Sequence, residues 1–485
     1  MTIDAWIIQA AARTPHKCAI EFHDQALSYQ QFAELISVRA AQLTDQGIGR
    51  GDRIGWLGFN HPEVFVLLFA AARLGAMLVP LNWRLSDVEL ATILADCAPR
   101  LVFHDDDMGA RANDLAPVQA QAIWPQTHDL AARDLPDSAS KSDPLMIVYT
   151  SGSTGTPKGV VLTQAALKAN AKMSIQAHDL RPDDTVLNVL PLFHVGGLNI
   201  LPTPAFSIGA TVLLHKIFDP VAMIEDLGRA QAAITVPTVL AAVMAQPEWD
   251  RADLSHLRVL SIGSTDVPRS MIDAVHTREV PVVQIYGATE TSPLAIYQTP
   301  DTAMATAGSI GRTGCACQIR LVGPDGIDVK NDMAGEVWVK GDNTVHSYWH
   351  DPALTAASVD QGWYKTGDMA RRDTAGNYWF ADRLKHIIIS GGENIYPAEI
   401  ERVLRTHPAV KEVAVVGQAD AKWGETPVAV IVADEAIAQA EILQFLQGKL
   451  ARYKLPSRVV SVNALPRNAM GKVVAADVKQ MLAGL

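Results

Sequence analysis

Cysteine is scarce in this chain, since its 485 residues include only Cys18, Cys97, Cys315 and Cys317. The spacing of Cys315 and Cys317 is too tight for a usual zinc site, and no second Cys or His pair lies nearby. We therefore expect four reduced thiols in a cytoplasmic protein, and no zinc centre.

A block of basic residues is also missing. The formal net charge is −11, and the charged residues are spread along the chain. Because a phosphate backbone requires a cationic footprint, nucleic acid is not expected as a partner. Hydrophobic residues make up 48% of the sequence and charged residues 19%, which favours a folded protein with more than one core over a disordered chain.

Long apolar runs of the membrane-spanning kind are missing as well. The N-terminus has neither the basic start nor the long apolar run of a signal peptide. The most apolar stretch, residues 62–81, contains Glu63 and Arg73, which a bilayer span should not tolerate near its middle. We expect no integral membrane segment, and predict a buried helix at 62–74 followed by a strand at 76–79.

Helix and strand patterns alternate along most of the chain. Ser28 to Gln31 matches a capping box that opens a helix, and apolar residues at helical spacing follow it as far as Gly47. A strand is predicted at 53–57, and the alternation continues to about residue 380. Residues 105–143 have only weak periodicity and interrupt this alternation, so they are predicted to form a surface segment, called here the surface excursion. The pattern predicts an α/β fold of layered, mostly parallel sheets.

The C-terminal part has a different texture from about residue 308. Short β-like runs at 318–322 and 335–340 predict a small β-rich subdomain. After Arg383 the pattern becomes β-α-β, with strands predicted at 387–390, 413–416 and 428–432 and a helix at 398–405. We predict a large N-terminal domain at 1–383 and a small, mobile α+β C-terminal domain at 384–485.

One loop carries the strongest chemical signal. Residues 149–159 read Tyr-Thr-Ser-Gly-Ser-Thr-Gly-Thr-Pro-Lys-Gly and follow an apolar strand. Glycines and hydroxyls let backbone N–H groups approach an anion, and Lys158 adds a full positive charge. A P-loop would place Gly-Lys-Ser/Thr at the start of a helix, whereas here Pro157 precedes the lysine and a strand is expected at 160–163. The combination makes a plain flexible loop improbable and predicts a site for the phosphates of ATP.

On this loop, and on motifs that follow it in order as far as Lys472, the chain resembles the adenylate-forming superfamily. The resemblance covers nearly the whole chain and is greatest to the acyl- and aryl-CoA synthetases, also called the AMP-dependent synthetase and ligase family. It implies that ATP is bound by the loop residues Thr150, Ser151, Gly152, Ser153, Thr154, Gly155 and Lys158.

Two further motifs are similar to the nucleotide site of that family. Gly263, Ser264 and Thr265 stand where the family often has a Gly-Gly-Ala run along the adenine, so the two hydroxyl residues depart from its pattern. The run 286–290, Tyr-Gly-Ala-Thr-Glu, is the second strong match. The resemblance assigns ATP binding to all five residues of this run, Gly287 and Ala288 included. Tyr286 would stack on the adenine, and Thr289 would bond the α-phosphate. Glu290 would hold Mg²⁺ together with Thr150 of the phosphate loop.

The remaining motifs lie towards the C-terminus. The resemblance assigns the ribose hydroxyls to Asp368 and Arg383, the hinge between domains to Lys385, and catalysis of adenylation to Lys472, together with Thr289. The family often has glycine where this chain has Asp382. The residues that the resemblance assigns to CoA binding are Gly391, Gly392, Trp423, Tyr453 and Lys454. The alternative for Trp423 is a purely structural role.

The acid substrate is the least defined partner. The run 191–197 resembles the family motif in which a histidine lines the acid pocket near the carboxylate, although a lone histidine between apolar residues is usually structural. The expected pocket residues are small or apolar: His194, which is also a catalytic candidate, Val195, Gly197, Pro237, Ala288, Pro293 and Leu294. No arginine is evident for a second carboxylate, which disfavours malonate and leaves fatty acids of short to long chain and aryl acids open.

The resemblance implies an ATP-dependent acid–CoA ligase that forms acyl-AMP and then acyl-CoA, with the C-terminal domain pivoting at Lys385 between the steps. The expected partners are a carboxylic acid, ATP with Mg²⁺, and CoA, and a homodimer is one option for assembly. The alternatives are transfer of the acyl group to a carrier protein and a silent nucleotide-binding homologue.

Overall fold

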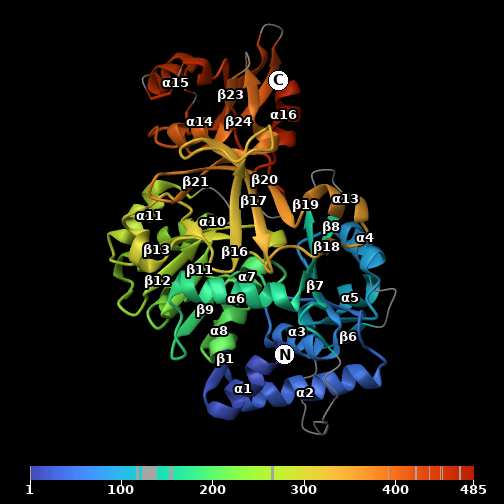
Figure 1. Cartoon of the computed structure of the whole chain (residues 1–485). Coiled ribbons are helices and arrows are strands. Elements are labelled where there is room, and N and C mark those ends of the chain that lie inside the picture. Colours follow the sequence, from blue (N-terminus) through green and yellow to red (C-terminus); the bar gives the residue numbers. More distant parts are fainter. Residues whose placement is uncertain are drawn as a thin grey trace. The chain divides into compact units, whose positions relative to one another are not determined.

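The computed structural model describes residues 2–115, 120–122, 139–151, 157–263, 267–390, 393–420, 423–435, 437–447, 449–450, 452–468 and 471–484. The chain forms two compact units (Figure 1). Unit 1 comprises residues 1–319 and 339–365, and unit 2 comprises residues 320–338 and 366–485. The domain boundary predicted at residue 383 stays a prediction, as does the hinge at Lys385.

Unit 1 contains a nine-stranded sheet with the order β15-β14-β13-β12-β11-β9-β10-β1-β2. Its central strands, from β1 to β13, pair in parallel, and the outer strands β2, β14 and β15 are antiparallel. The strands are β1 Cys18–Phe22, β2 Gln25–Ser28, β9 Thr185–Asn188, β10 Thr211–Leu214, β11 Ala232–Thr235, β12 Val259–Ile262, β13 Val282–Tyr286, β14 Ile296–Tyr297 and β15 Arg312–Thr313.

A second, seven-stranded sheet of unit 1 has the order β18-β8-β7-β4-β3-β5-β6. Strands β3 to β7 pair in parallel, whereas β8 is antiparallel to both β7 and β18. The strands are β3 Arg53–Leu57, β4 Met77–Leu81, β5 Leu101–His104, β6 Ala120–Ala122, β7 Pro144–Ser151, β8 Pro157–Thr163 and β18 Ser347–Tyr348. The prediction of an α/β fold with mostly parallel sheets is confirmed.

Two helices of unit 1 begin where the sequence signals predict. Ser28 forms the predicted capping box with Gln31 at the start of α2, and Pro62 opens α3, which ends before Gly75. The helices are α1 Ala5–Arg13, α2 Tyr29–Asp45, α3 Pro62–Leu74, α4 Asp87–Cys97, α5 Gly109–Leu115, α6 Gln164–His178, α7 Val195–Asn199, α8 Pro202–Ile208, α9 Pro220–Leu227, α10 Pro237–Met244, α11 Arg269–His276, α12 Pro300–Ala303 and α13 Pro352–Ser358. The predicted excursion at 105–143 therefore contains α5, and much of its remainder lies outside the described residues.

The predicted buried helix α3 lies at the centre of the core. Every residue of α3 except Arg73 is buried, and its Glu63 carboxylate is paired with the Arg39 guanidinium at 2.6 Å. This pairing removes the cost of burying an isolated charge. The rings of Phe32 and Phe69 lie 5.2 and 6.0 Å from Phe206 in the same core. In the described part of the chain, no helix combines the length and apolarity that a bilayer crossing needs.

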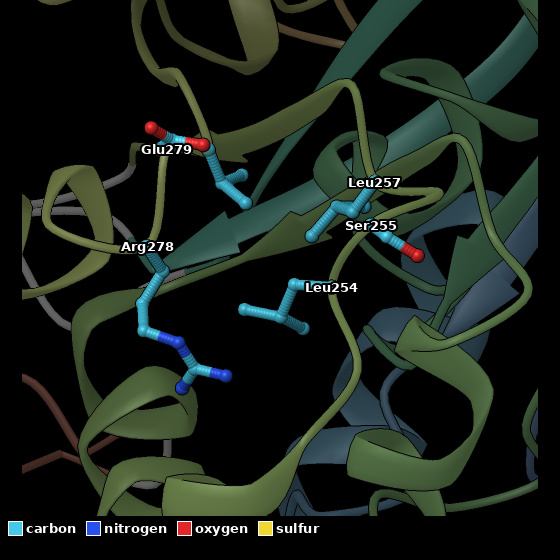
Figure 2. A pocket seen from close by; sticks show the side chains of 6 residues that line it. Leu254, Ser255, Leu257, Arg278 and Glu279 are labelled. Atoms are coloured by element: carbon cyan, nitrogen blue, oxygen red, sulfur yellow. The ribbon is translucent and has the colours of Figure 1, made fainter.

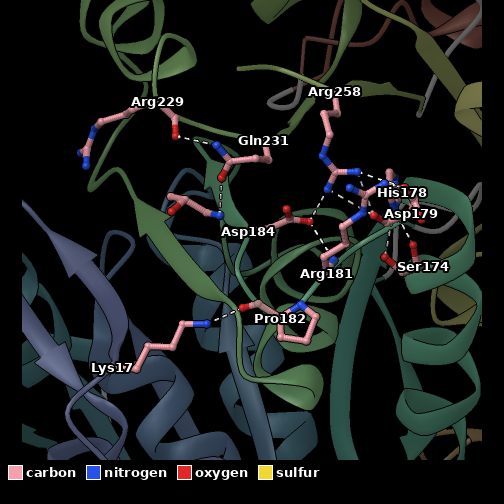
Figure 3. A network of polar contacts seen from close by, with 11 residues as sticks. Lys17, Ser174, His178, Asp179, Arg181, Pro182, Asp184, Arg229, Gln231 and Arg258 are labelled. Carbon is pink, nitrogen blue, oxygen red and sulfur yellow. Dashed lines mark hydrogen bonds and ion pairs between the residues drawn. The ribbon is translucent and has the colours of Figure 1, made fainter. Parts of the chain in front are cut away.

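A polar network ties together the amino ends of the parallel strands (Figure 3). The Arg258 guanidinium, just before β12, donates to carboxylate oxygens of Asp179 at 3.0 Å and Asp184 at 2.5 Å. At the end of α6, a ring nitrogen of buried His178 lies 2.9 Å from the Ser261 hydroxyl on β12. These contacts fix the strand order from the end of the sheet opposite the predicted motifs.

A third sheet contains β16, β17, β19, β20 and β21. Its order is β16-β17-β20-β19, with β21 beside β20. The strands are β16 Cys317–Val322, β17 Ala334–Gly341, β19 Val359–Asp360, β20 Trp363–Arg372 and β21 Tyr378–Arg383, which confirms the predicted β-rich subdomain.

The rest of unit 2 has its own sheet and core, as predicted. The sheet order is β23-β22-β25-β24, with β26 parallel to β25. The elements are β22 Ile388–Ser390, β23 Glu393–Ile395, α14 Pro397–Leu404, β24 Glu412–Asp420, β25 Gly424–Val432, α15 Gln439–Leu446, β26 Arg458–Ser461 and α16 Ala475–Ala483. The predicted α+β pattern of this part is therefore confirmed.

Candidate active site

Two antiparallel strands, β7 and β8, flank the predicted phosphate loop. Strands β7 and β8 pair without a break from Tyr149–Gly159 to Ser151–Pro157. Thr150 and Lys158 are directly opposed, so their side chains share one face of the hairpin, and the Thr150 hydroxyl lies 3.5 Å from the Lys158 carbonyl oxygen. The predicted ligands Gly152, Ser153, Thr154 and Gly155 lie outside the described residues. A strand follows the loop, as expected, which sets it apart from a P-loop.

The base of this hairpin is held by residues that the sequence analysis missed. The hydroxyl of half-buried Tyr149 donates to Asp96 Oδ2 at 2.5 Å, and desolvation is the main reason that its pKa is raised. The Trp349 indole N–H donates to the Asp96 carbonyl oxygen at 3.2 Å, while the Trp349 backbone N–H donates to the Gly159 carbonyl oxygen at 2.7 Å. The end of α4 therefore anchors the strand that leads into the loop.

The predicted motif at 286–290 forms a compact turn after β13. A Cβ atom added to Gly287 would lie 1.6 Å from the Pro293 carbonyl oxygen, so this position requires glycine. Within the turn the Thr291 hydroxyl accepts from the Ala288 N–H at 2.9 Å and donates to the Pro293 carbonyl oxygen at 2.7 Å. Buried β13 leads directly into this turn, which leaves the predicted ligands Tyr286 and Glu290 half-buried.

Glu290 lies against two tyrosines that the motif search did not identify. The Tyr348 hydroxyl donates to Glu290 Oε1 at 2.9 Å, and the Val345 N–H donates to the Glu290 carbonyl oxygen at 2.7 Å. Tyr364 lies close to both Tyr348 and Glu290. Burial and the nearby Glu290 charge raise the pKa of both phenols, which keeps them protonated. The neutral phenol of Tyr348 therefore helps to orient the Glu290 carboxylate.

Three buried asparagines hold the predicted acid-pocket residues of the turn. The Asn170 side chain accepts from the Leu294 N–H at 3.1 Å and donates to the Asn199 carbonyl oxygen at 2.6 Å. Asn199, at the end of α7, donates to the Ser292 carbonyl oxygen at 3.4 Å, and Asn343 donates to the Leu294 carbonyl oxygen at 2.8 Å. These bonds link α7, which begins at predicted Val195, to the turn that carries Pro293.

The local structure around two predicted acid-pocket residues, His194 and Gly197, is well defined. His194 is half-buried at the start of α7, with its ring centroid 4.5 Å from that of Phe193. A Cβ atom on Gly197 would lie 2.3 Å from the Pro191 carbonyl oxygen, so this glycine is required by backbone packing rather than by space for a ligand. Pro237 begins α10 after β11, and Gly263 follows β12, whereas Ser264 and Thr265 lie outside the described residues.

Unit 2 brings together three of the predicted residues. Asp368 on β20 is opposed to Arg383 on β21, and their Oδ1 and Nε atoms are 3.2 Å apart. Lys472 lies close enough to both for their charges to act on it: burial and the Arg383 guanidinium lower the pKa of Lys472, while Asp368 opposes them. The ribose candidates and the catalytic candidate therefore form one charged cluster.

The turn that presents Lys472 is built from its own neighbours. The Asn468 side-chain oxygen accepts from the Lys472 N–H at 3.0 Å, and the Asn468 N–H donates to the Lys472 carbonyl oxygen at 2.9 Å. The Arg467 guanidinium donates to the Gly471 carbonyl oxygen at 2.6 Å and pairs with Glu412 at 2.6 Å. The turn is therefore closed by bonds within five residues and anchored to β24.

Asp382, which departs from the family pattern, has a structural role. Its buried carboxylate accepts from the Arg383 N–H at 2.6 Å and from the Ala398 N–H, in the first turn of α14, at 2.8 Å. A carboxylate at a helix N-terminus satisfies backbone donors and complements the helix dipole. Asp382 therefore joins β21 to α14 across the predicted hinge, where the Lys385 backbone lies in the short helix Leu384–His386.

The predicted CoA residues are only partly described. Gly391 and Gly392 lie outside the described residues, but Ser390, just before them, pairs with Gly424, the neighbour of Trp423. Trp423 is 49% exposed, which favours contact with a ligand over a core role. Lys454 forms a 2.7 Å ion pair with Glu399 on α14, and Tyr453 lies in the short helix Arg452–Lys454.

A surface hollow of about 440 Å³ lies elsewhere on unit 1 (Figure 2). It is lined by Leu254, Ser255, Leu257, Arg278, Glu279 and Val280, all before the starts of β12 and β13. The Arg278 guanidinium already donates to the carbonyl oxygens of Trp249 at 3.0 Å and Ala252 at 2.6 Å. None of the predicted site residues lines this hollow, so it is separate from the candidate site.

Comparison with known proteins agrees with this set of motifs. The pattern of the AMP-binding enzyme family matches residues 7–349, and that of the AMP-binding enzyme C-terminal domain matches residues 399–472. The chain is 45% identical over 504 residues to an indoleacetate–CoA ligase from Aromatoleum aromaticum, covering 100% of this chain and 98% of the relative. It is 36% identical to a feruloyl-CoA synthase from Amycolatopsis sp., covering 99% and 98%.

Solved structures give the same result. An O-succinylbenzoate coenzyme A synthetase from Bacillus subtilis, in complex with ATP and magnesium ion, matches with a TM-score of 0.88 and 30% identity over 99% of both chains. ATP-bound MatB from Rhodopseudomonas palustris matches with a TM-score of 0.91 and 27% identity over 99% of both chains. The chain belongs to the AMP-binding enzyme family, as the order of its motifs predicted.

Proposed function

We propose that this enzyme is an ATP-dependent acid–CoA ligase whose acid carries an aromatic ring. In the first step the acid carboxylate attacks the α-phosphate of ATP, which forms acyl-AMP and releases pyrophosphate. In the second step the CoA thiol attacks the acyl carbon, the thioester forms and AMP leaves. The observation that carries the proposal is full-length similarity to an indoleacetate–CoA ligase with Glu290, Asp368 and Lys472 all in place.

The two steps need different help from the chain. A carboxylate is a poor acyl donor because oxide is a poor leaving group, whereas AMP leaves readily. We assign Lys472 to the charge that develops between carboxylate and α-phosphate, and Asp368 with Arg383 to the ribose. One fixed donor in a water-poor site contributes about 3 kcal/mol to such a step. The charged cluster of these three residues in unit 2 supports the assignment.

Glu290 and Thr150 are the residues that would hold Mg²⁺. Mg²⁺ takes one or two protein carboxylates and fills its remaining positions with phosphate and water oxygens, so one half-buried carboxylate beside neutral donors fits it. When bound, the ion neutralises charge on the triphosphate. A relative whose structure contains ATP and magnesium ion supports this reading.

The proposed acid class follows from the relatives and from the expected pocket. Relatives named for indoleacetate and ferulate match 99–100% of this chain at 45% and 36% identity, whereas one named for long-chain fatty acids matches 93% at 35% identity. The expected pocket residues Val195, Pro293 and Leu294 are apolar and buried. An uncharged ring suits such a lining, and a second carboxylate such as that of malonate does not.

Pyrophosphate release with a panel of acids, with and without CoA, tests this proposal. We expect the highest kcat/KM for an arylacetate or cinnamate-type acid, a lower value for a long-chain fatty acid and none for malonate. Formation of acyl-AMP without CoA, followed by thioester on its addition, is expected. Thioester formed only on a carrier protein would favour the alternative acceptor, and no pyrophosphate with any acid would favour a silent homologue.

The hinge and the location of the enzyme belong to the same proposal. If the C-terminal domain turns at Lys385 between the steps, Lys385→Pro should slow the CoA step more than adenylation. Stopped-flow measurement of each half-reaction checks this, and equal slowing would count against the hinge.

A cytoplasmic location is proposed because ATP and CoA are both supplied there. Analytical ultracentrifugation will decide between a monomer and a homodimer.

A further inference from the structure

Two buried phenols, Tyr348 and Tyr364, lie next to Glu290 in unit 1. Tyr348 donates to Glu290 Oε1 at 2.9 Å, and Tyr364 lies close enough to both groups that they raise its pKa. Tyr348 is 7% exposed and Tyr364 is 6% exposed. A hydrogen bond from Tyr364 to the Tyr348 hydroxyl would make Tyr348 a better donor and complete a relay that strengthens the contact with the carboxylate.

The same short segment fixes both the backbone and the side chain of Glu290. Val345 donates to the Glu290 carbonyl oxygen at 2.7 Å, and three residues later Tyr348 reaches the carboxylate. Tyr348 lies on β18 opposite Val160 of β8, the strand that returns from the phosphate loop. Its own N–H donates to the Thr355 hydroxyl at 2.9 Å. The position of Glu290 is therefore coupled to the phosphate hairpin through one strand pairing.

The chemistry of the donor matters as much as its position. An arginine or lysine at this place would cancel the charge of Glu290 and compete with a metal ion. A neutral phenol does not itself cancel that charge, and it limits rotation of the carboxylate. Because a cation site gains from preorganised oxygen ligands, a donor of this kind is suited to a carboxylate that binds a metal.

We propose that Tyr348, supported by Tyr364, is a positioning residue that sets the magnesium requirement of adenylation by orienting the Glu290 carboxylate. The inference rests on the proposed function, because it takes Glu290 as the ligand of the magnesium that accompanies ATP. It concerns the first step alone, since the attack of CoA on acyl-AMP consumes no ATP.

The test compares Tyr348→Phe with a matched control, Tyr297→Phe. Tyr297 is also a hydrogen-bonded phenol of unit 1, but its hydroxyl donates to Gln176 Oε1 at 2.7 Å instead of to Glu290. Calorimetric titration of ATP at a series of Mg²⁺ concentrations is the first measurement, and pyrophosphate release over the same series is the second. Each variant is also given preformed acyl-AMP and CoA.

We expect Tyr348→Phe to raise the half-saturating Mg²⁺ concentration about tenfold in both measurements, since a hydrogen bond to a charged group is lost. ATP binding without Mg²⁺ and the CoA step should stay at wild-type values, as should all properties of Tyr297→Phe. Tyr364→Phe should produce a smaller shift of about two- to threefold, because only the support of the relay is lost.

An unchanged Mg²⁺ requirement in a folded Tyr348→Phe protein would overturn the inference. Equal losses in both steps, independent of Mg²⁺, would also overturn it and assign Tyr348 a merely structural role. If Tyr348→Phe does not fold, the half-saturating Mg²⁺ concentration of Tyr364→Phe is measured instead. A wild-type value in that variant would refute the relay. Failure of the wild type to release pyrophosphate with any acid would instead refute the proposed function, so the two failures are distinguishable.

Discussion

In unit 1, Glu290 is bonded by Tyr348, which lies 58 residues further along the chain, and the turn that carries it is bonded by Asn170, 124 residues before Leu294. In unit 2, the backbone of Lys472 is bonded by Asn468, four residues before it, and Asp368 by Thr366, two residues before it. The two predicted halves of the chemistry are therefore built in different ways. The Glu290 turn is held by distant partners, whereas the backbone at Lys472 and Asp368 is held by near neighbours and their charged side chains meet from distant parts of unit 2.

This difference has consequences for stability and for the effect of mutations. A bond between distant residues forms only when the intervening chain is folded, so the geometry of Glu290 depends on the whole of unit 1. A turn closed by its own neighbours keeps its geometry when a single side chain is removed. Substitutions in unit 1 should therefore couple stability to activity, whereas those in the unit 2 cluster should separate them.

The largest effect that sharpens the comparison is expected from Lys472→Ala. Loss of the fixed charge should lower the rate of adenylation by about 100-fold or more, while thioester formation from supplied acyl-AMP and the melting temperature change little. Pyrophosphate release and calorimetry check this against Lys479→Ala, which removes a lysine ion-paired with Glu425 at 3.9 Å. Equal loss in both half-reactions would break the assignment of Lys472 to adenylation alone.

A pH effect on stability is expected from unit 1. His178 is fully buried between Ser174 and Ser261, and burial lowers its pKa to about 4 from the ordinary 6.5. The unfolded chain takes up a proton below pH 6.5 that the native chain does not, so stability is present above pH 6.5 and is lost as the pH falls towards 4. The loss amounts to about 3 kcal/mol.

Chemical denaturation between pH 7 and pH 4 measures this loss. His178→Gln should flatten the dependence, since glutamine carries no titrating proton, whereas His350→Gln removes a histidine that is 63% exposed and should not flatten it. An unchanged slope in His178→Gln would show that other groups govern acid stability. It would also weaken the view that unit 1 depends on buried long-range polar contacts.

Gly287→Ala should couple stability and activity in unit 1. The added Cβ atom meets the Pro293 carbonyl oxygen, so the turn must open, at about 2 kcal/mol, and adenylation should fall in parallel. Gly49→Ala is the control, because nothing lies within 4 Å of a Cβ atom at that position. A stable Gly287→Ala protein with full adenylation would show that Glu290 does not depend on this turn.

The smallest effect is expected from Asp382→Ala in unit 2. Removing the carboxylate leaves the N–H of Ala398 without its acceptor and should cost about 1 kcal/mol. Hydrogen exchange of the first turn of α14 should accelerate, while exchange at β7 and β8 stays unchanged. Unchanged exchange in α14 would contradict the role of Asp382 as a helix cap.

Much of the fold and part of the site could be predicted. The α3 bounds, the capping box at Ser28 and the strand after the phosphate loop follow from local patterns that any folded state would preserve. The motif residues Glu290, Asp368 and Lys472 were found because each lies in a run with a defined spacing. Tyr348, Asn170 and Asp96 could not be found in that way, because what distinguishes each is a partner far along the chain.

By itself, the sequence determined the family, the α/β character and the residue types available for ATP, because these depend on composition, periodicity and short motifs. It also determined the turn at Lys472, whose bonds span only a few residues. Only the tertiary structure decided how Glu290 is oriented, why Gly197 must be glycine and what Asp382 does. Those properties depend on atoms that the folded sheets bring together, and chain spacing does not encode their distances.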